Sequence, residues 1–275
     1  MMNQPAPSLR VERDGAVAEV VLDRPGRLNA MEPSFFRELR EEFAALRDDE
    51  SVRAVLIWGE GRVFSTGLDR SRSLDLVPPV GPGVSEARRN HLLHAVIREF
   101  QRSIGAVAEC PKPVIAAVHG LCIGGGLDLA AACDIRMCAA DAQFSLHETK
   151  VAMVADLGAL QRLTRLVGPG LAREMAYTGD PIAAPRALAF GLVNEIHPDK
   201  TALLAAARAL AARIAANAPA AVQGVKEVLG FAERYGERAG LEQVALWNSA
   251  FFFSRDLEES FRAFAEKRDP AYDGS

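Results

Sequence analysis

The segment from Lys112 to Ala132, KPVIAAVHGLCIGGGLDLAAA, constrains the fold more than any other part of the chain. It passes from an apolar run typical of a buried strand, through a turn, into consecutive glycines and then into a helical stretch. Glycines after a strand let the backbone approach a ligand closely, and the first N–H groups of a helix lack intrahelical partners. The segment therefore predicts a strand-to-helix junction that is either a tight packing turn or part of a binding site.

The other elements follow from the same kind of pattern. Two alternating apolar runs flank Asp14 and Gly15 and predict a hairpin over residues 9–23. Further strands and helices are expected across the first two thirds, and everything from Lys200 onward reads as helical. The expected strands span 52–59, 112–120, 134–140, 142–146 and 191–197, and a Pro/Gly/Ser-rich loop spans 70–85. The expected helices include 32–50, 86–109 and, near the C-terminus, 241–268. We expect an α/β core, residues 1–199, and a helical C-terminal region, residues 200–275.

Composition excludes several classes of protein. A formal charge of −4 offers no basic face for nucleic acid. The four cysteines, Cys110, Cys122, Cys133 and Cys138, lack the spacing of a metal site and are expected to be buried thiols. The N-terminus has no secretory signal pattern, and no apolar run is long enough to span a bilayer, so a cytoplasmic location is predicted. No nucleotide-binding glycine motif and no nucleophile elbow occur.

A second glycine turn, FSTGLDR at residues 64–70, also follows an expected strand. If it met the turn at Gly124–Gly126, two backbone N–H groups could point at one oxygen. Such an oxyanion hole stabilises the enolate of a thioester as its charge develops. Whether the two turns converge is a question of tertiary structure.

Four motifs in order, FSTGLD, HGLCIGGGLDLAAACDIR, AQFSLHE and LGALQRL, resemble the enoyl-CoA hydratase/isomerase (crotonase) family over residues 9–269. The resemblance implies a ClpP-like spiral of ββα units with a C-terminal helical trimerisation region. It implies an acyl-CoA thioester as substrate, no cofactor beyond that CoA, and a homotrimer or a dimer of trimers.

The resemblance also implies which residues bind the substrate. The backbone N–H groups of Leu68 and Gly125 would form the oxyanion hole. Other motif positions would contact the thioester, the pantetheine chain or CoA: Ser65, Thr66, Gly67, Asp69 and Gly124 at the two turns, Arg24, Leu28 and Ala30 in the early loop RPGRLNAM, and Lys267 near the C-terminus.

Three carboxylates, Asp128, Glu148 and Asp156, lie in mostly apolar stretches. Hydratases of the family carry glutamates at the positions of Asp128 and Glu148, and a shorter aspartate at the first position draws its carboxylate back. The addition of Asp156 resembles the Δ3,5-Δ2,4-dienoyl-CoA isomerases. In that interpretation Glu148 and Asp156 transfer protons, Asp128 orients them, and apolar surroundings keep Asp156 protonated.

Alternatives remain open for each residue and for the chain. Asp128 could complement a helix dipole, Glu148 could be a surface acid near Lys150, and Asp156 could cap the helix at LGALQRL. The chain could be a hydratase that activates water with Asp128 and Glu148, or an acyl-CoA-binding scaffold without turnover. His91 and His94 lack a third ligand, so no metal site is predicted.

Overall fold

The computed structural model of the chain describes residues 7–69, 71 and 76–275. Its larger sheet has the strand order β1-β2-β3-β4-β6-β9. β1 and β2 form the expected antiparallel hairpin, with Gly15 at a positive φ of 55°, and the remaining neighbours pair in parallel. The strands are β1 (Leu9–Asp14), β2 (Val17–Leu22), β3 (Ala54–Gly59), β4 (Val114–Val118), β6 (Ile135–Ala139) and β9 (Glu195–His197).

A smaller sheet contains β5 (Leu121–Ile123), β7 (Gln143–Ser145) and β8 (Ile182–Ala183), in that order. β4 and β6 each lead into a strand of this second sheet, β5 and β7, and helical segments follow. After β5 comes α3 (Gly125–Ala132), and after β7 come the 3₁₀ turn η3 (Glu148–Val151) and α4 (Ala159–Leu166). Repeated strand–strand–helix units therefore build the spiral that was predicted.

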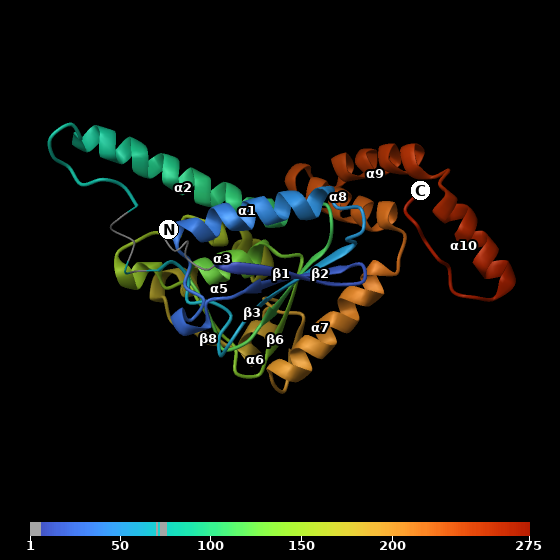
Figure 1. Ribbon diagram of the computed structural model, residues 1–275, viewed down its shortest axis with the longest axis horizontal. Helices are drawn as coiled ribbons and strands as arrows, with labels where there is room; N and C mark the ends of the chain where they lie inside the picture. The colour runs from blue at the N-terminus through green and yellow to red at the C-terminus, as the bar shows by residue number, and fades with distance from the viewer. Residues whose placement is uncertain (1–6, 70, 72–75) are drawn as a thin grey trace, which may run out of the picture.

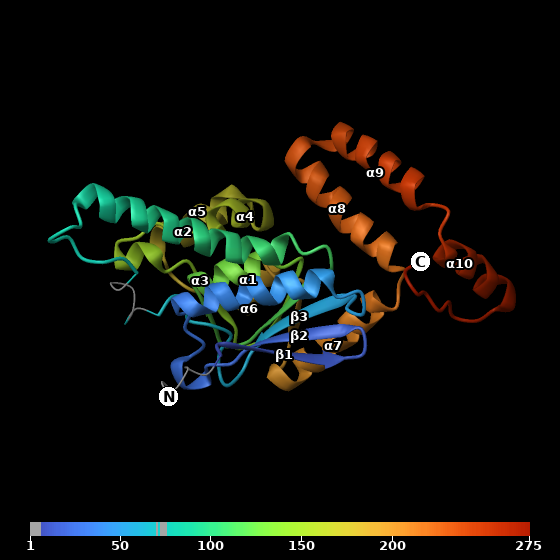
Figure 2. The same ribbon diagram turned by 45° about the horizontal axis from the view of Figure 1, so that its top comes forward.

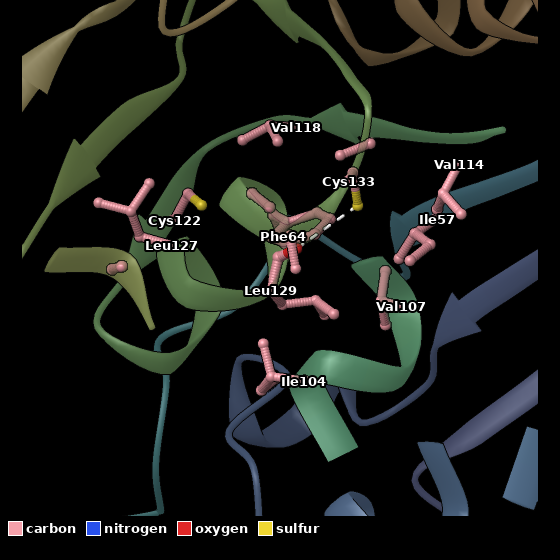
Figure 3. Packing of buried hydrophobic residues seen from close by; sticks show 14 of the residues in the cluster. Ile57, Phe64, Ile104, Val107, Val114, Val118, Cys122, Leu127, Leu129 and Cys133 are labelled. Atoms are coloured by element: carbon pink, nitrogen blue, oxygen red, sulfur yellow. Dashed lines mark hydrogen bonds between the residues drawn. The ribbon is translucent and has the colours of Figure 1, made fainter. Parts of the chain in front are cut away.

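Helices cover both faces of the larger sheet (Figures 1 and 2). α1 (Pro33–Asp48), α2 (Glu86–Ala108) and α3 lie on one face, and α7 (Lys200–Ala215) packs on the other. Because both faces are covered, β3 is buried along its whole length, as parallel strands usually are. Figure 3 shows Phe64 among Ile104 and Val107 of α2 and Leu129 of α3, so the glycine-turn region rests on a closely packed core.

The chain ends in an extension that projects from this core (Figures 1 and 2). It consists of α8 (Pro219–Tyr235), α9 (Glu237–Phe251) and α10 (Arg255–Glu266). α7 is different, since Leu203, Ala207 and Ala211 are buried against the sheet. The predicted boundary between residues 1–199 and 200–275 thus falls between α7 and the strands on which α7 packs. In the described part of the chain, no helix combines the length and apolarity needed to cross a membrane.

The remaining helices, α5 (Gly168–Thr178) and α6 (Ala184–Ala189), follow α4. The helix expected across residues 241–268 breaks at 252–254, where the Ser254 hydroxyl accepts the Leu257 N–H and caps α10. The last expected strand is confined to Glu195–His197. Of the expected loop at 70–85, residues 70 and 72–75 lie outside the described residues. All four cysteines are buried free thiols, as predicted.

Candidate active site

Three stretches from distant parts of the sequence lie side by side at the site. The early loop joins the first glycine turn through Met31 N–H to Gly67 O (2.8 Å) and Asp69 N–H to Met31 O (2.9 Å). The first turn joins the second through Ser65 N–H to Leu121 O and Ile123 N–H to Ser65 O, both 3.0 Å. The backbone itself therefore ties residues 28–31, 64–69 and 121–125 into one unit.

Asn29 locks the early loop onto this unit. Its buried amide nitrogen donates to the carbonyl groups of Val63 (2.9 Å) and Phe64 (3.1 Å), and its oxygen accepts the Arg24 N–H at 2.9 Å. Leu28 and Asn29 both have positive φ, at 53° and 52°. A residue other than glycine keeps such a strained backbone conformation only where the surrounding contacts hold it in place. Asn29 was not among the predicted site residues, although it lies between Leu28 and Ala30 in the early loop RPGRLNAM.

The two glycine turns do converge. A Cβ placed on Gly67 would lie 2.9 Å from the Gly125 nitrogen, and one placed on Gly125 would lie 3.6 Å from the Leu68 nitrogen. Among the described residues, neither the Leu68 N–H nor the Gly125 N–H donates to any protein acceptor. Gly125 opens α3, where a free N–H is expected. Two unpaired donors close together are what an oxyanion hole requires.

Each glycine of the triplet faces a different neighbour. A Cβ on Gly124 would approach Glu148 Oε1 to 2.9 Å, one on Gly125 would approach Met31 Sδ to 3.2 Å, and one on Gly126 would approach Ser65 O to 2.8 Å. Because the three glycines lack side chains, the Glu148 carboxylate, the early loop and the first glycine turn can all approach the start of α3 closely.

Asp128 is buried one turn into α3 and belongs to this helix start. Its Oδ1 accepts the Ala159 N–H at 2.6 Å and so holds the first residue of α4. Burial, with smaller contributions from the charges of Glu148 and Asp156, raises the pKa of Asp128 to about 7 against the opposing effect of that hydrogen bond. The cap of α4 is therefore Asp128, from another helix, rather than Asp156.

Glu148 opens η3 and turns its carboxylate toward Gly124. Its Oε2 is buried and has no hydrogen-bond partner among the described residues. Burial and the nearby charge of Asp156 raise the pKa of Glu148. A buried carboxylate oxygen without a protein partner is available to a substrate proton.

Asp156 lies half-buried before α4, and burial raises the pKa of its carboxyl group as well. The charge of Asp156 acts on Glu148, and both charges act on Asp128, so the fold brings the three carboxylates into one electrostatic group. Carboxyl groups whose pKa values are raised together in this way are typical of acid–base chemistry.

Several of the residues predicted to bind CoA lie next to one another, where the early loop meets the first glycine turn. The Arg24 guanidinium donates to Ala30 O (2.6 Å), forms an ion pair with Glu32 (2.5 Å) and lies 3.8 Å from the Asp69 carboxylate. The Thr66 N–H donates to Leu28 O at 3.2 Å. Ser65 is fully buried, and its hydroxyl donates to Asn29 O while it accepts the Gly67 N–H, so this side chain shapes the turn.

Lys267 is not brought to the site within one chain. It follows α10, and Figures 1 and 2 place that helix in the projecting extension, away from α3. No group of three or more potential metal ligands occurs among the residues that the structure describes.

Comparison with known proteins gives a consistent result. The model of the family described as enoyl-CoA hydratase/isomerase matches residues 12–275. A relative from Dictyostelium discoideum named mitochondrial Δ3,5-Δ2,4-dienoyl-CoA isomerase is 43% identical, over 96% of this chain and 90% of that protein. One from Arabidopsis thaliana, named as the peroxisomal form, is 38% identical over 96% and 95%. The crystal structure of an enoyl-CoA hydratase from Bacillus anthracis superimposes with a TM-score of 0.88 at 30% identity, covering 98% of this chain and all of that one.

Proposed function

The chain belongs to the enoyl-CoA hydratase/isomerase family, and on that premise we propose that it isomerises 3,5-dienoyl-CoA to 2,4-dienoyl-CoA. The observation that carries the proposal is the third carboxyl group. Asp156 joins Glu148 and Asp128 in one electrostatic group, and its pKa is raised by burial. The relatives from Dictyostelium discoideum and Arabidopsis thaliana described above carry the name of this activity.

The reaction needs two proton transfers at separate carbons. In our proposal Glu148, as the carboxylate, removes a proton from C2, and the electron pair moves onto the thioester oxygen. The Leu68 and Gly125 N–H groups would stabilise this dienolate. Protonated Asp156 would then donate to C6, which leaves double bonds at C2 and C4. Exchange with solvent returns Glu148 to the charged form and Asp156 to the neutral form, so protons balance over the cycle.

Asp128 would act on this chemistry indirectly. Its carboxylate oxygen is already engaged with the Ala159 N–H, so it would orient the segment that carries Asp156. The same contact weakens the hydratase alternative, in which Asp128 and Glu148 together activate a water. An acyl-CoA-binding scaffold without turnover would not require the free N–H groups of the two turns or the unpartnered Glu148 oxygen.

The substrate would bind as an acyl-CoA, with no other cofactor. The early loop at Arg24, Leu28 and Ala30 would contact the CoA moiety, and Thr66, Gly67, Asp69 and Gly124 would line its path to the carboxylates. Assembly as a homotrimer or a dimer of trimers would allow Lys267 to reach a neighbour's CoA. The predicted cytoplasmic location is part of this proposal, although the two named relatives are mitochondrial and peroxisomal.

The test is an ultraviolet assay with 3,5-dienoyl-CoA and crotonyl-CoA in parallel. We expect conjugated 2,4-dienoyl absorbance to grow rapidly and crotonyl-CoA to be hydrated slowly. Asp156→Asn and Glu148→Gln should each lower the isomerisation rate by at least about 100-fold, since general acid–base groups typically contribute that much.

Asp180→Asn is the matched control, because Asp180 is an exposed acid paired with Lys150. It should retain the wild-type rate. An Asp156→Asn variant with a near-normal isomerisation rate would contradict the acid role. Fast crotonyl-CoA hydration without dienoyl turnover would identify the chain as a hydratase.

A further inference from the structure

The segment between Glu148 and Asp156 is exposed at its centre, whereas Ala155 and Leu157, on either side of Asp156, are buried in the core. Ala152 adopts a positive φ of 59°, and the Met153 N–H returns to Glu148 O at 2.9 Å, which anchors the first end. Val154 is 71% exposed. The far end is anchored at Ala159 by the Asp128 carboxylate. Asp156 lies between these anchors, outside regular secondary structure.

One side chain reaches the backbone of Asp156 directly. The Gln101 amide nitrogen, on α2, donates to Asp156 O at 2.6 Å. Within the described residues, no other group beyond the segment itself hydrogen-bonds the Asp156 backbone. The partners are 55 residues apart in sequence, so this contact exists only in the folded chain.

Gln101 is itself well placed to act as a fixed support. Its amide oxygen accepts from the Arg98 guanidinium at 2.9 Å, which leaves the nitrogen side of the amide to face Asp156. The neighbouring Phe100 ring stacks on Phe36 of α1 with centroids 3.8 Å apart, and Ile104 is fully buried. This part of α2 is therefore packed against the core while the amide is directed at the segment.

We propose that Gln101 is a positioning residue of the isomerase, whose amide holds the Asp156 backbone so that the carboxyl group stays in place to protonate C6. This inference rests on the proposed function. Gln101 acts through Asp156 and has no role at the thioester. Its loss should therefore slow the delivery of the proton to C6 and leave the removal of the proton from C2 intact.

The experiment uses the full-length protein with Gln101→Met and Gln101→Ala. Methionine keeps the length of the side chain and removes the donor, so it separates the hydrogen bond from packing. We expect kcat for 3,5-dienoyl-CoA to fall about 10- to 100-fold in both variants, because small displacements of reacting groups cost this much. KM should stay within about twofold, since no contact with CoA is changed.

A second readout distinguishes positioning from general damage. In D₂O, a dienolate that waits longer for its proton at C6 returns more often to substrate with deuterium at C2. The ratio of deuterated recovered substrate to product should therefore rise in the Gln101 variants.

Gln161→Ala provides the control, because Gln161 is an exposed glutamine on α4 whose side chain makes no hydrogen bond in the described structure. It should match the wild type in every readout. A Gln101→Met variant with wild-type kcat, or one that loses isomerisation with an unchanged deuterium ratio, would overturn the positioning role. A wild-type protein that does not isomerise 3,5-dienoyl-CoA would instead refute the proposed function.

Discussion

Gly124 adopts φ 53° and ψ −119°, a backbone conformation that residues with a Cβ avoid. A methyl group there would also approach Glu148 Oε1 to 2.9 Å. Gly124→Ala should therefore displace the carboxylate and lower kcat for isomerisation by about 10- to 100-fold. Steady-state assays of the purified variant measure this effect.

Gly170→Ala serves as its control, because a Cβ on this exposed α5 glycine would meet nothing within 4 Å. The control should keep the wild-type kcat. Equal rates for Gly124→Ala and the wild type would mean that the Glu148 position does not depend on this glycine.

Asp128 makes the stability of the protein depend on pH. Its pKa is about 7 in the folded protein and near the ordinary value of 3.8 in the unfolded chain. The folded state thus binds the proton more tightly, so the contribution of Asp128 to stability is fully present below about pH 4 and is lost as pH rises through about 7. The loss amounts to at most about 4 kcal/mol.

Asp128→Asn removes this titration and keeps an oxygen that can accept the Ala159 N–H. The free energy of unfolding of the variant, relative to the wild type, should therefore increase as the pH rises from about 5 to about 7, the folded-state pKa of Asp128, and then level off. Urea unfolding at fixed protein concentration measures it. A difference that stays constant with pH would show that Asp128 does not titrate in this range.

At the scale of elements, α8 and α9 pack through a glycine. A Cβ on Gly224 would lie 2.2 Å from the Trp247 indole nitrogen, and that nitrogen is buried with no partner among the described residues. Gly224→Ala should force the helices apart and destabilise the hairpin by about 1–3 kcal/mol. Thermal unfolding followed by circular dichroism tests this.

Gly230→Ala in the same helix is the comparison, since a Cβ there has nothing within 4 Å. Alanine favours the helix over glycine, so this variant should unfold at the same or a higher temperature. If both alanine variants behaved alike, the close approach of Trp247 to Gly224 would not contribute to stability.

At the scale of the whole molecule, the extension exposes large apolar side chains. Phe253 is 95% exposed and Phe264 85% exposed, and Leu229 and Leu246 are more than half exposed. Exposed apolar surface of this extent is typical of a protein–protein interface. It supports the proposed assembly of copies of this chain.

Phe253→Glu should therefore weaken self-association and shift the mass toward the monomer in sedimentation velocity at micromolar concentration. A charge buried in an apolar interface is costly to desolvate. Phe253→Tyr, which keeps the ring, should retain the wild-type mass. An unchanged mass for the glutamate variant would place the interface elsewhere.

Local sequence patterns predicted most elements because their causes are local. Apolar runs of strand length, the turn at Asp14–Gly15 and the helical spacing of Phe36, Leu39 and Phe43 depend on neighbours within a few residues. The break at 252–254 was missed, since the Ser254 cap lies inside an otherwise helical pattern. The candidate carboxylates were also visible, as acids in apolar stretches.

By itself, then, the sequence determined the order of strands and helices, the glycine turns and the set of candidate acids. Only the tertiary structure decided how they are used. Asp128 caps a helix that begins 31 residues later, Asn29 binds carbonyl groups more than 30 residues away, and Gln101 reaches Asp156. The physical reason is that a hydrogen bond depends on which groups meet in space, and chain folding sets that across separations that no local pattern records.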